Sequence, residues 1–198
     1  AINAENGRRL WTAQVGRTDE ATLSVVSNSD LVLVLAGPSV YGYNKFTGTQ
    51  LLQFRLPEQP AAGPALTEKA VFIPLHGGAV YAYSISVLEY LFRYGTLPED
   101  VAIPHMWRFI CGEEIVHSPV VGEQAIAFVS EKGNVFTVNS GGIEKGRARY
   151  QLLLNTPASA PLAIADNATS SSVLMLSDDN LAFSIDLITG KTEWTYPL

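Results

Sequence analysis

The feature that most constrains the fold is an eleven-residue pattern that occurs at both ends of the chain. It has a small residue, Asn or Asp two positions later, Gly after four more positions and Trp after another four. The copies are Ala1, Asn3, Gly7 and Trp11, and Ser184, Asp186, Gly190 and Trp194. Asn or Asp bonds the backbone of a following turn, Gly accepts a positive φ, and Trp covers a large apolar area. The pattern therefore describes a strand, a tight turn and the next strand, and its recurrence predicts a repeat protein.

Weaker copies of the pattern lie between the two ends. One consists of Gly42, Asn44, Gly48 and Leu52, with leucine in the tryptophan position. Two degraded copies begin at Ala82 and Thr137; Trp107 follows the first, and Arg149 or Tyr150 follows the second. If an insertion of roughly 15 residues before Trp107 is set aside, the residues at the tryptophan position of successive copies recur about every 40–45 residues. This is the length of a four-stranded propeller blade.

Short apolar runs mark the strands inside each repeat. They cover residues 31–35, 71–73, 125–129 and 173–176, and each is followed by a Gly, Asp or Asn turn and an alternating strand. A tight hairpin is thus repeated four times. The sequence predicts an all-β chain, a β-propeller of four-stranded antiparallel blades. We expect an outer strand over residues 1–16 and blades over about 17–57, 58–112, 113–155 and 156–198.

Composition narrows the function classes. The apolar fraction of 47% and the charged fraction of 16% are typical of a compact protein. A net charge of −6 disfavours nucleic-acid binding, which needs a basic face. No apolar run reaches the length of about 18 residues that a membrane span needs. A single cysteine, Cys111, excludes an intrachain disulfide and is expected to be a buried structural thiol.

The copies of the pattern at the two ends resemble the tryptophan-docking motif of the PQQ-type, or quinoprotein-like, β-propellers. The resemblance implies that the chain is part of a seven- or eight-bladed propeller. Some relatives are alcohol dehydrogenases that hold PQQ and Ca²⁺, many with a vicinal disulfide. Others, such as the outer-membrane barrel-assembly lipoprotein, are scaffolds that bind proteins.

The resemblance is closer to the scaffold members than to the dehydrogenases. Cys111 stands alone, and no metal-ligand or catalytic-base motif of the enzymes matches this sequence. We therefore expect no catalytic, cofactor-binding or metal-binding residues. The resemblance implies a protein or peptide partner and a periplasmic or cell-envelope location.

The insertion over residues 86–105 is the most individual feature and the candidate partner-binding element. It contains Leu88, Tyr90, Leu91 and Phe92. The spacing of Leu88, Leu91 and Phe92 indicates that these three residues would share one face of a helix. Either it forms a docking element that stands off the propeller, or it folds against its own blade or caps an edge. Open blade edges are a second candidate surface, for pairing with another copy of the chain.

Other polar residues are expected to be structural. His76, His105 and His117 are too far apart for a local metal motif, and Glu113–Glu114 and Asp178–Asp179 do not have the spacing of a calcium loop. The leading hypothesis is a non-catalytic scaffold. The alternatives are a small-ligand-binding or sensor module of a larger protein, and a quinoprotein dehydrogenase fragment.

Overall fold

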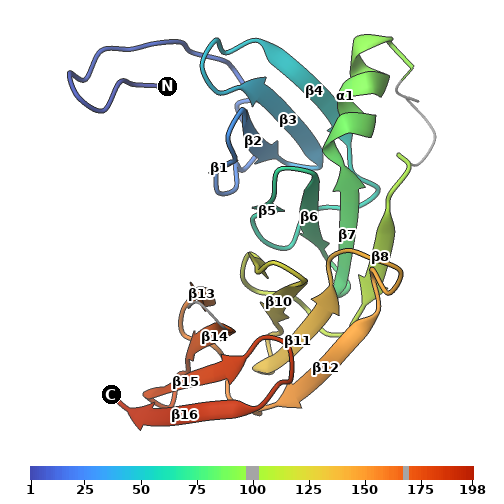
Figure 1. Cartoon of the computed structure of the whole chain (residues 1–198). Helices are drawn as coiled ribbons and strands as arrows, with labels where there is room; N and C mark the ends of the chain where they lie inside the picture. Colours follow the sequence, from blue (N-terminus) through green and yellow to red (C-terminus); the bar gives the residue numbers. More distant parts are fainter. Residues whose placement is uncertain (97–102, 167–169) are drawn as a thin grey trace.

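The computed structural model describes residues 1–96, 103–166 and 170–198, and in these ranges the chain forms four separate four-stranded sheets (Figure 1). Each sheet is an antiparallel meander in chain order, and we call the sheets blades 1 to 4. Blade 1 contains β1 (Val26–Ser27), β2 (Leu31–Ala36), β3 (Ser39–Asn44) and β4 (Gln50–Arg55); blade 2 contains β5 (Ala65–Leu66), β6 (Ala70–Leu75), β7 (Ala79–Ser84) and β8 (Trp107–Ile110). Blade 3 contains β9 (Val120–Val121), β10 (Ala125–Val129), β11 (Asn134–Asn139) and β12 (Ala148–Leu153); blade 4 contains β13 (Ala163–Asp166), β14 (Ser171–Leu176), β15 (Leu181–Asp186) and β16 (Thr192–Pro197).

The blades stand side by side in an arc that is not closed, with the short first strands on its inner side (Figure 1). The single helix among the described residues is α1 (Ile85–Arg93), between β7 and β8 at the outer rim. The all-β prediction and the four-stranded antiparallel blades are confirmed. Each expected blade range contains one sheet.

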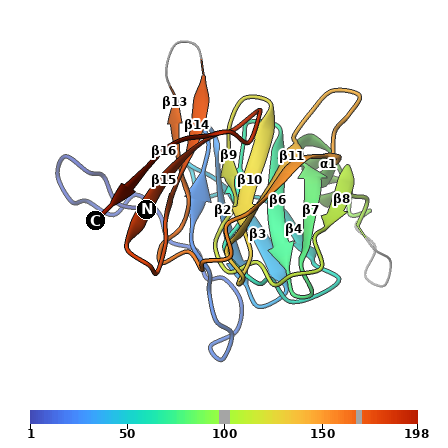
Figure 2. The same cartoon turned by 90° about the horizontal axis from the view of Figure 1, so that it is seen from below.

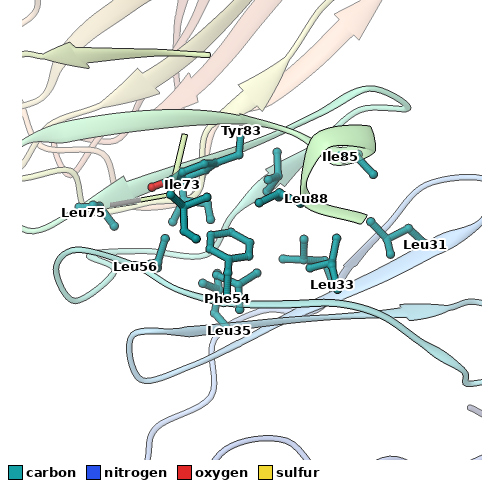
Figure 3. Close-up of a cluster of buried hydrophobic side chains, with 14 residues drawn as sticks. Leu31, Leu33, Leu35, Phe54, Leu56, Ile73, Leu75, Tyr83, Ile85 and Leu88 are labelled. Carbon is teal, nitrogen blue, oxygen red and sulfur yellow. The ribbon is translucent and has the colours of Figure 1, made fainter. Parts of the chain in front are cut away.

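The core lies between successive blades rather than inside any one of them. Because neighbouring residues of a strand point to opposite faces, one strand serves two cores. In β6, Val71 and Ile73 pack in the cluster shared with blade 1, whereas Phe72 packs in the cluster shared with blade 3. Figure 3 shows the first cluster, where Phe54 of β4 meets Tyr83 of β7 with ring centroids 5.2 Å apart. Stability therefore depends on blade-to-blade contacts.

The outer strand expected over residues 1–16 is not present. This segment has one isolated bridge, between Ile2 and Arg9, and it extends as a loop away from the sheets (Figure 2). The described residues offer it no inner strand with which a sheet ladder could form. It is nevertheless attached to blade 1 through Trp11.

Candidate interaction surfaces

The recurring motif makes contacts between neighbouring blades. Trp11 lies over the turn at Gly48, where a Cβ atom would be 2.7 Å from the indole ring. Its Nε1 donates a 2.9 Å hydrogen bond to the carbonyl oxygen of Lys45, and its ring lies 6.1 Å from that of Tyr43. Only glycine leaves room for the ring here, so tryptophan and glycine form one unit across two repeats. We call such a contact a docking pair.

The Asp or Asn of the motif holds the turn that carries the docking glycine. Oδ1 of Asp186 accepts hydrogen bonds from the backbone N–H groups of Ile188 (3.0 Å) and Thr189 (2.6 Å) and from the Thr189 hydroxyl (2.7 Å). These hydrogen bonds, the one from the Thr189 side chain foremost, hold the pKa of Asp186 below its usual value. Asn3 and Asn44 accept the equivalent backbone hydrogen bonds in their own turns.

Two further docking pairs join blade 2 to blade 3 and blade 3 to blade 4. Trp107 lies over Gly146, and the Tyr150 ring lies over Gly190 at 2.7 Å from the position of a Cβ atom. The Tyr150 hydroxyl donates a 3.1 Å hydrogen bond to the carbonyl oxygen of Asp186. The Trp107 indole N–H is buried and has no acceptor in the described part of the chain. Gly146 was missed in the sequence because its turn is longer than the others.

The junction between blades 1 and 2 is built differently. Leucine occupies the tryptophan position of blade 1 at Leu52, and helix α1 replaces the turn that would receive a tryptophan in blade 2. Leu52 is fully buried over Gly42, and Leu88 of α1 is 1% exposed in the same cluster. Phe92 packs against this cluster from the next turn of the helix. The inner face of α1 therefore takes the place of a docking pair.

The opposite face of α1 is apolar and open. Its members are spaced i, i+3, i+4 and i+7, and we call them the outer stripe of α1: Val87, Tyr90 and Leu91 of the helix and Tyr94, its C-cap residue. Tyr90 is 60% and Tyr94 62% exposed, and their rings lie 4.7 Å apart. Of the predicted partner-binding residues, Tyr90 is exposed and Leu91 and Phe92 are half-buried. The prediction that Leu88 binds a partner is wrong, because its side chain faces the core and cannot contact a partner.

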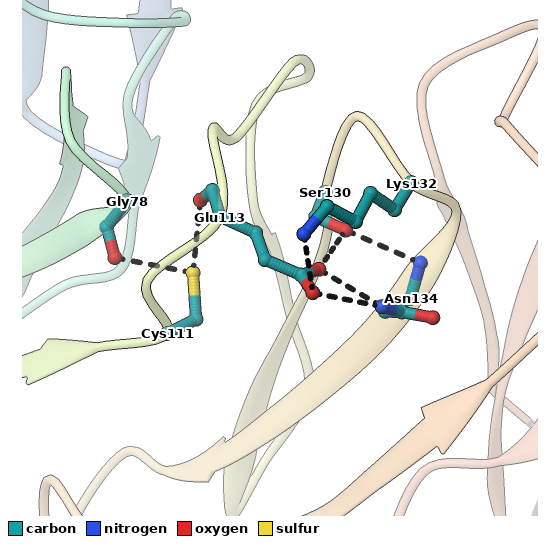
Figure 4. Close-up of polar contacts among 6 residues, drawn as sticks. All are labelled: Gly78, Cys111, Glu113, Ser130, Lys132 and Asn134. Carbon is teal, nitrogen blue, oxygen red and sulfur yellow. Dashed lines mark hydrogen bonds and ion pairs between the residues drawn. The ribbon is translucent and has the colours of Figure 1, made fainter. Parts of the chain in front are cut away.

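Glu113, the first residue of the acidic pair, and Cys111 lie where blades 2 and 3 meet (Figure 4). Glu113 accepts hydrogen bonds from the Ser130 hydroxyl (2.6 Å) and from the Asn134 amide (2.9 and 3.0 Å). These bonds, that of Ser130 first, lower the pKa of Glu113. The Cys111 thiol donates to the carbonyl oxygens of Gly78 and Glu113, each at 3.1 Å, and burial raises its pKa. The arrangement ties loops together and keeps the sulfur protonated.

The histidines do not converge on a common site. They contact separate groups: His76 bonds Glu114, His105 packs on Tyr81, and His117 Nε2 lies 3.3 Å from the carbonyl oxygen of Ala158. Asp178 and Asp179 are exposed in the turn between β14 and β15. Among residues 1–96, 103–166 and 170–198, no three His, Cys, Asp or Glu side chains gather as metal ligands. The same ranges contain no helix long and apolar enough to cross a membrane.

Comparison with solved structures shows propellers. BamB from Moraxella catarrhalis matches with a TM-score of 0.68 and 16% identity, over 89% of this chain and 48% of that one. KlHsv2 with a replaced loop matches with a TM-score of 0.64 and 8% identity, over 92% of this chain and 56% of that one. The C-terminal WD40 domain of Sif2 matches with a TM-score of 0.62 and 14% identity, over 89% of this chain and 46% of that one. The chain thus spans about half the length of these proteins.

Sequence comparison identifies the family. No curated protein is detectably similar to the chain. The family model described as outer membrane protein assembly factor BamB matches residues 1–103, just over half of the chain. This match agrees with the docking pairs and with the arc of four blades. The chain therefore belongs to the PQQ-like propeller family of the outer membrane protein assembly factor BamB.

Proposed function

We propose that this chain is a non-catalytic scaffold that binds a protein partner through the outer stripe of α1. The observation that carries the proposal is that one face of α1 packs in the core while the opposite face is exposed. Leu88 fixes α1 in the core, so the rings of Tyr90 and Tyr94 are presented on a rigid support. Tyrosine is enriched among residues that dominate binding energy, because it buries a large area and orders few torsions.

The geometry fits a partner with an apolar groove. Four apolar positions along one face of a helix are the spacing used when a helix binds in a groove. Glu89 and Arg93 lie in the same two turns of α1 and place one charge of each sign near the stripe. The family description supports an envelope protein involved in outer-membrane assembly as partner, and a periplasmic or envelope location for the chain.

The test compares the chain with a Tyr90→Ser/Tyr94→Ser variant in crosslinking to an envelope extract. The control is Ile143→Ser, which changes a 99% exposed apolar residue in the β11–β12 turn. A protein captured by the chain and by the control is then purified and titrated. We expect the double variant to raise its Kd about 30-fold or more, the effect of losing a hot spot of about 2 kcal/mol.

Two results would contradict the proposal. The first is a captured partner that binds the double variant as tightly as the unchanged chain while circular dichroism shows all three proteins equally folded. The second concerns catalysis. Addition of PQQ and Ca²⁺ is expected to give no alcohol-dependent dye reduction, and reproducible turnover would replace the scaffold by a dehydrogenase.

A further inference from the structure

A groove of about 610 Å³ lies beside the first turn of α1, and all of its lining residues fall between Asn28 and Lys145. Three blades contribute to it: the β1–β2 turn of blade 1, the β5–β6 turn and the two ends of the insertion in blade 2, and the β11–β12 turn of blade 3. Blade 2 stands between the other two blades (Figure 1). Ligand sites in proteins typically have volumes of about 300–1,000 Å³, so the groove has the size of a binding site.

The groove exists because a helix replaces a turn in blade 2. In blades 3 and 4, the turn between the third and fourth strands carries a docking glycine, Gly146 or Gly190, which a ring of the preceding blade covers. In blade 2 the chain instead enters α1 at Ser84 and returns to β8 through Met106, and both residues line the groove. The groove therefore lies where a docking turn closes the corresponding part of blades 3 and 4.

Hydrogen bonds fix the backbone around the groove. The N–H group of Ile85, the first residue of α1, donates a 3.0 Å hydrogen bond to the carbonyl oxygen of Lys69. Glu68 accepts hydrogen bonds from the Ser29 hydroxyl (2.6 Å) and backbone N–H (3.1 Å), which join the turns of blades 1 and 2. These bonds, that of the hydroxyl first, lower the pKa of Glu68, so its carboxylate is charged at neutral pH. Because the walls are held in place before anything binds, little conformational entropy is lost on binding.

Charges of both signs face the groove without pairing with each other. Asp30 and Glu68 place two carboxylates at the blade 1 end, and Lys145 places an ammonium group at the blade 3 end. Lys69 and Glu89 add one charge of each sign in blade 2. Among the residues that the structure describes, none of these five side chains forms an ion pair. A ligand can therefore meet free charges of opposite sign at the two ends of the groove.

We infer that the groove binds an extended segment of a partner protein, with a basic side chain at the blade 1 end and an acidic side chain at the blade 3 end. The charges belong to different blades, so one small ion cannot contact both groups, whereas an extended chain spans them. Lys45 interacts with Glu68 and offsets only one of the two negative charges at the blade 1 end. The groove also has apolar lining residues, which contact an apolar side chain of the segment: Leu31, Ile85 and Met106.

The experiment is an NMR titration of the isotope-labelled chain with short capped peptides at low salt. All of the peptides have a central leucine; one has arginine and glutamate on its two sides, one has two arginines and one has two glutamates. We expect the mixed peptide to bind most tightly and to shift the amide signals of Ser86, Glu89 and Lys145. Replacing either of its charged residues by the opposite type should weaken binding about two- to fivefold, the effect of one exposed ion pair.

Charge reversal at Lys145 tests the orientation of the segment. Lys145→Glu should weaken binding of the mixed peptide and make the peptide with two arginines the preferred ligand. Lys191→Glu makes the same charge change in the β15–β16 turn of blade 4, outside the groove, and should leave the order of affinities unchanged. Both lysines are exposed, so both variants should melt like the unchanged chain.

Several results would overturn the inference. They are the absence of a saturable shift of the groove amides at millimolar peptide, equal affinity for all three peptides, and an unchanged peptide preference in Lys145→Glu. Tightest binding of the peptide with two glutamates would assign the groove to anions and overturn the inference as well. Tyr90 and Tyr94 do not line the groove, so these results are independent of the proposed partner site on the outer stripe of α1.

Discussion

Replacing Gly146 by alanine tests whether docking pairs hold the blades together. Gly146 has a φ of +80°, and its added Cβ atom would lie 2.8 Å from Cβ and 2.9 Å from Cγ of Trp107. The Cβ atom of Trp107 moves only with its strand, so rotation of the side chain cannot relieve this contact. The substitution therefore carries two penalties, one from backbone strain and one from crowding between blades 2 and 3.

The two penalties are of similar size. A left-handed conformation costs an alanine about 1–2 kcal/mol. Crowding in a packed interior adds about 1–3 kcal/mol. For a chain of this size 1 kcal/mol corresponds to about 2–4 °C in Tm, so crowding alone lowers Tm by about 2–12 °C.

Gly77→Ala is the matched control. Gly77 has a φ of +82° in the β6–β7 turn, and nothing lies within 4 Å of its Cβ position. This variant is therefore destabilised by backbone strain alone. Thermal unfolding followed by circular dichroism gives both shifts. Trp107→Leu keeps the Cβ and Cγ atoms that the added methyl group meets, so it should leave most of the extra penalty of Gly146→Ala in place. Equal Tm shifts for Gly146→Ala and Gly77→Ala would refute the docking argument.

Four further substitutions test other contacts. Trp107→Phe should change stability by less than about 1 kcal/mol in urea denaturation, because losing a buried N–H that has no described acceptor offsets the lost volume. Leu88→Ala should cost about 2–5 kcal/mol and Tyr90→Ala less than about 0.5 kcal/mol, since one faces the core and the other solvent. Hydrogen bonds from Thr189 hold the pKa of Asp186 down, so its carboxylate stabilises the fold above the unfolded pKa and stops doing so as pH falls through the folded one. Asp186→Asn should therefore lower Tm at neutral pH and make no difference in strong acid; a constant deficit at all pH values would contradict this.

The repeat could be predicted from the sequence because each of its signals is local. The motif at Asp186 and Gly190 specifies one turn through contacts within a few residues, and alternating runs such as that of β7 specify a hairpin. The segment over residues 1–16 was predicted wrongly as a strand for the same reason. Its turn is formed, but a strand also needs a neighbour, and the described residues contain none for it.

The docking partners could not be predicted because they belong to different repeats. Gly146 follows a lengthened turn, and only contact with Trp107 in the preceding blade identifies it as a docking glycine. The sequence left Arg149 and Tyr150 as alternatives for the tryptophan position of blade 3. In the structure the docking residue is Tyr150, whose ring contacts Gly190. A motif read within one blade gives the residue types, whereas the pairing appears only when blades are placed side by side.

The leucine at Leu52 in blade 1 and the insertion after Ser84 in blade 2 belong together, because both alter the same junction between the two blades. A tryptophan at position 52 would need a glycine turn in blade 2, and that turn has been replaced by α1. A smaller side chain leaves room for Leu88, so both are buried together. Once the inner face of the helix holds the junction, its outer face is free of any role in folding. The rings of Tyr90 and Tyr94 can then be exposed without cost to the junction, which is what a binding surface on a repeat scaffold requires.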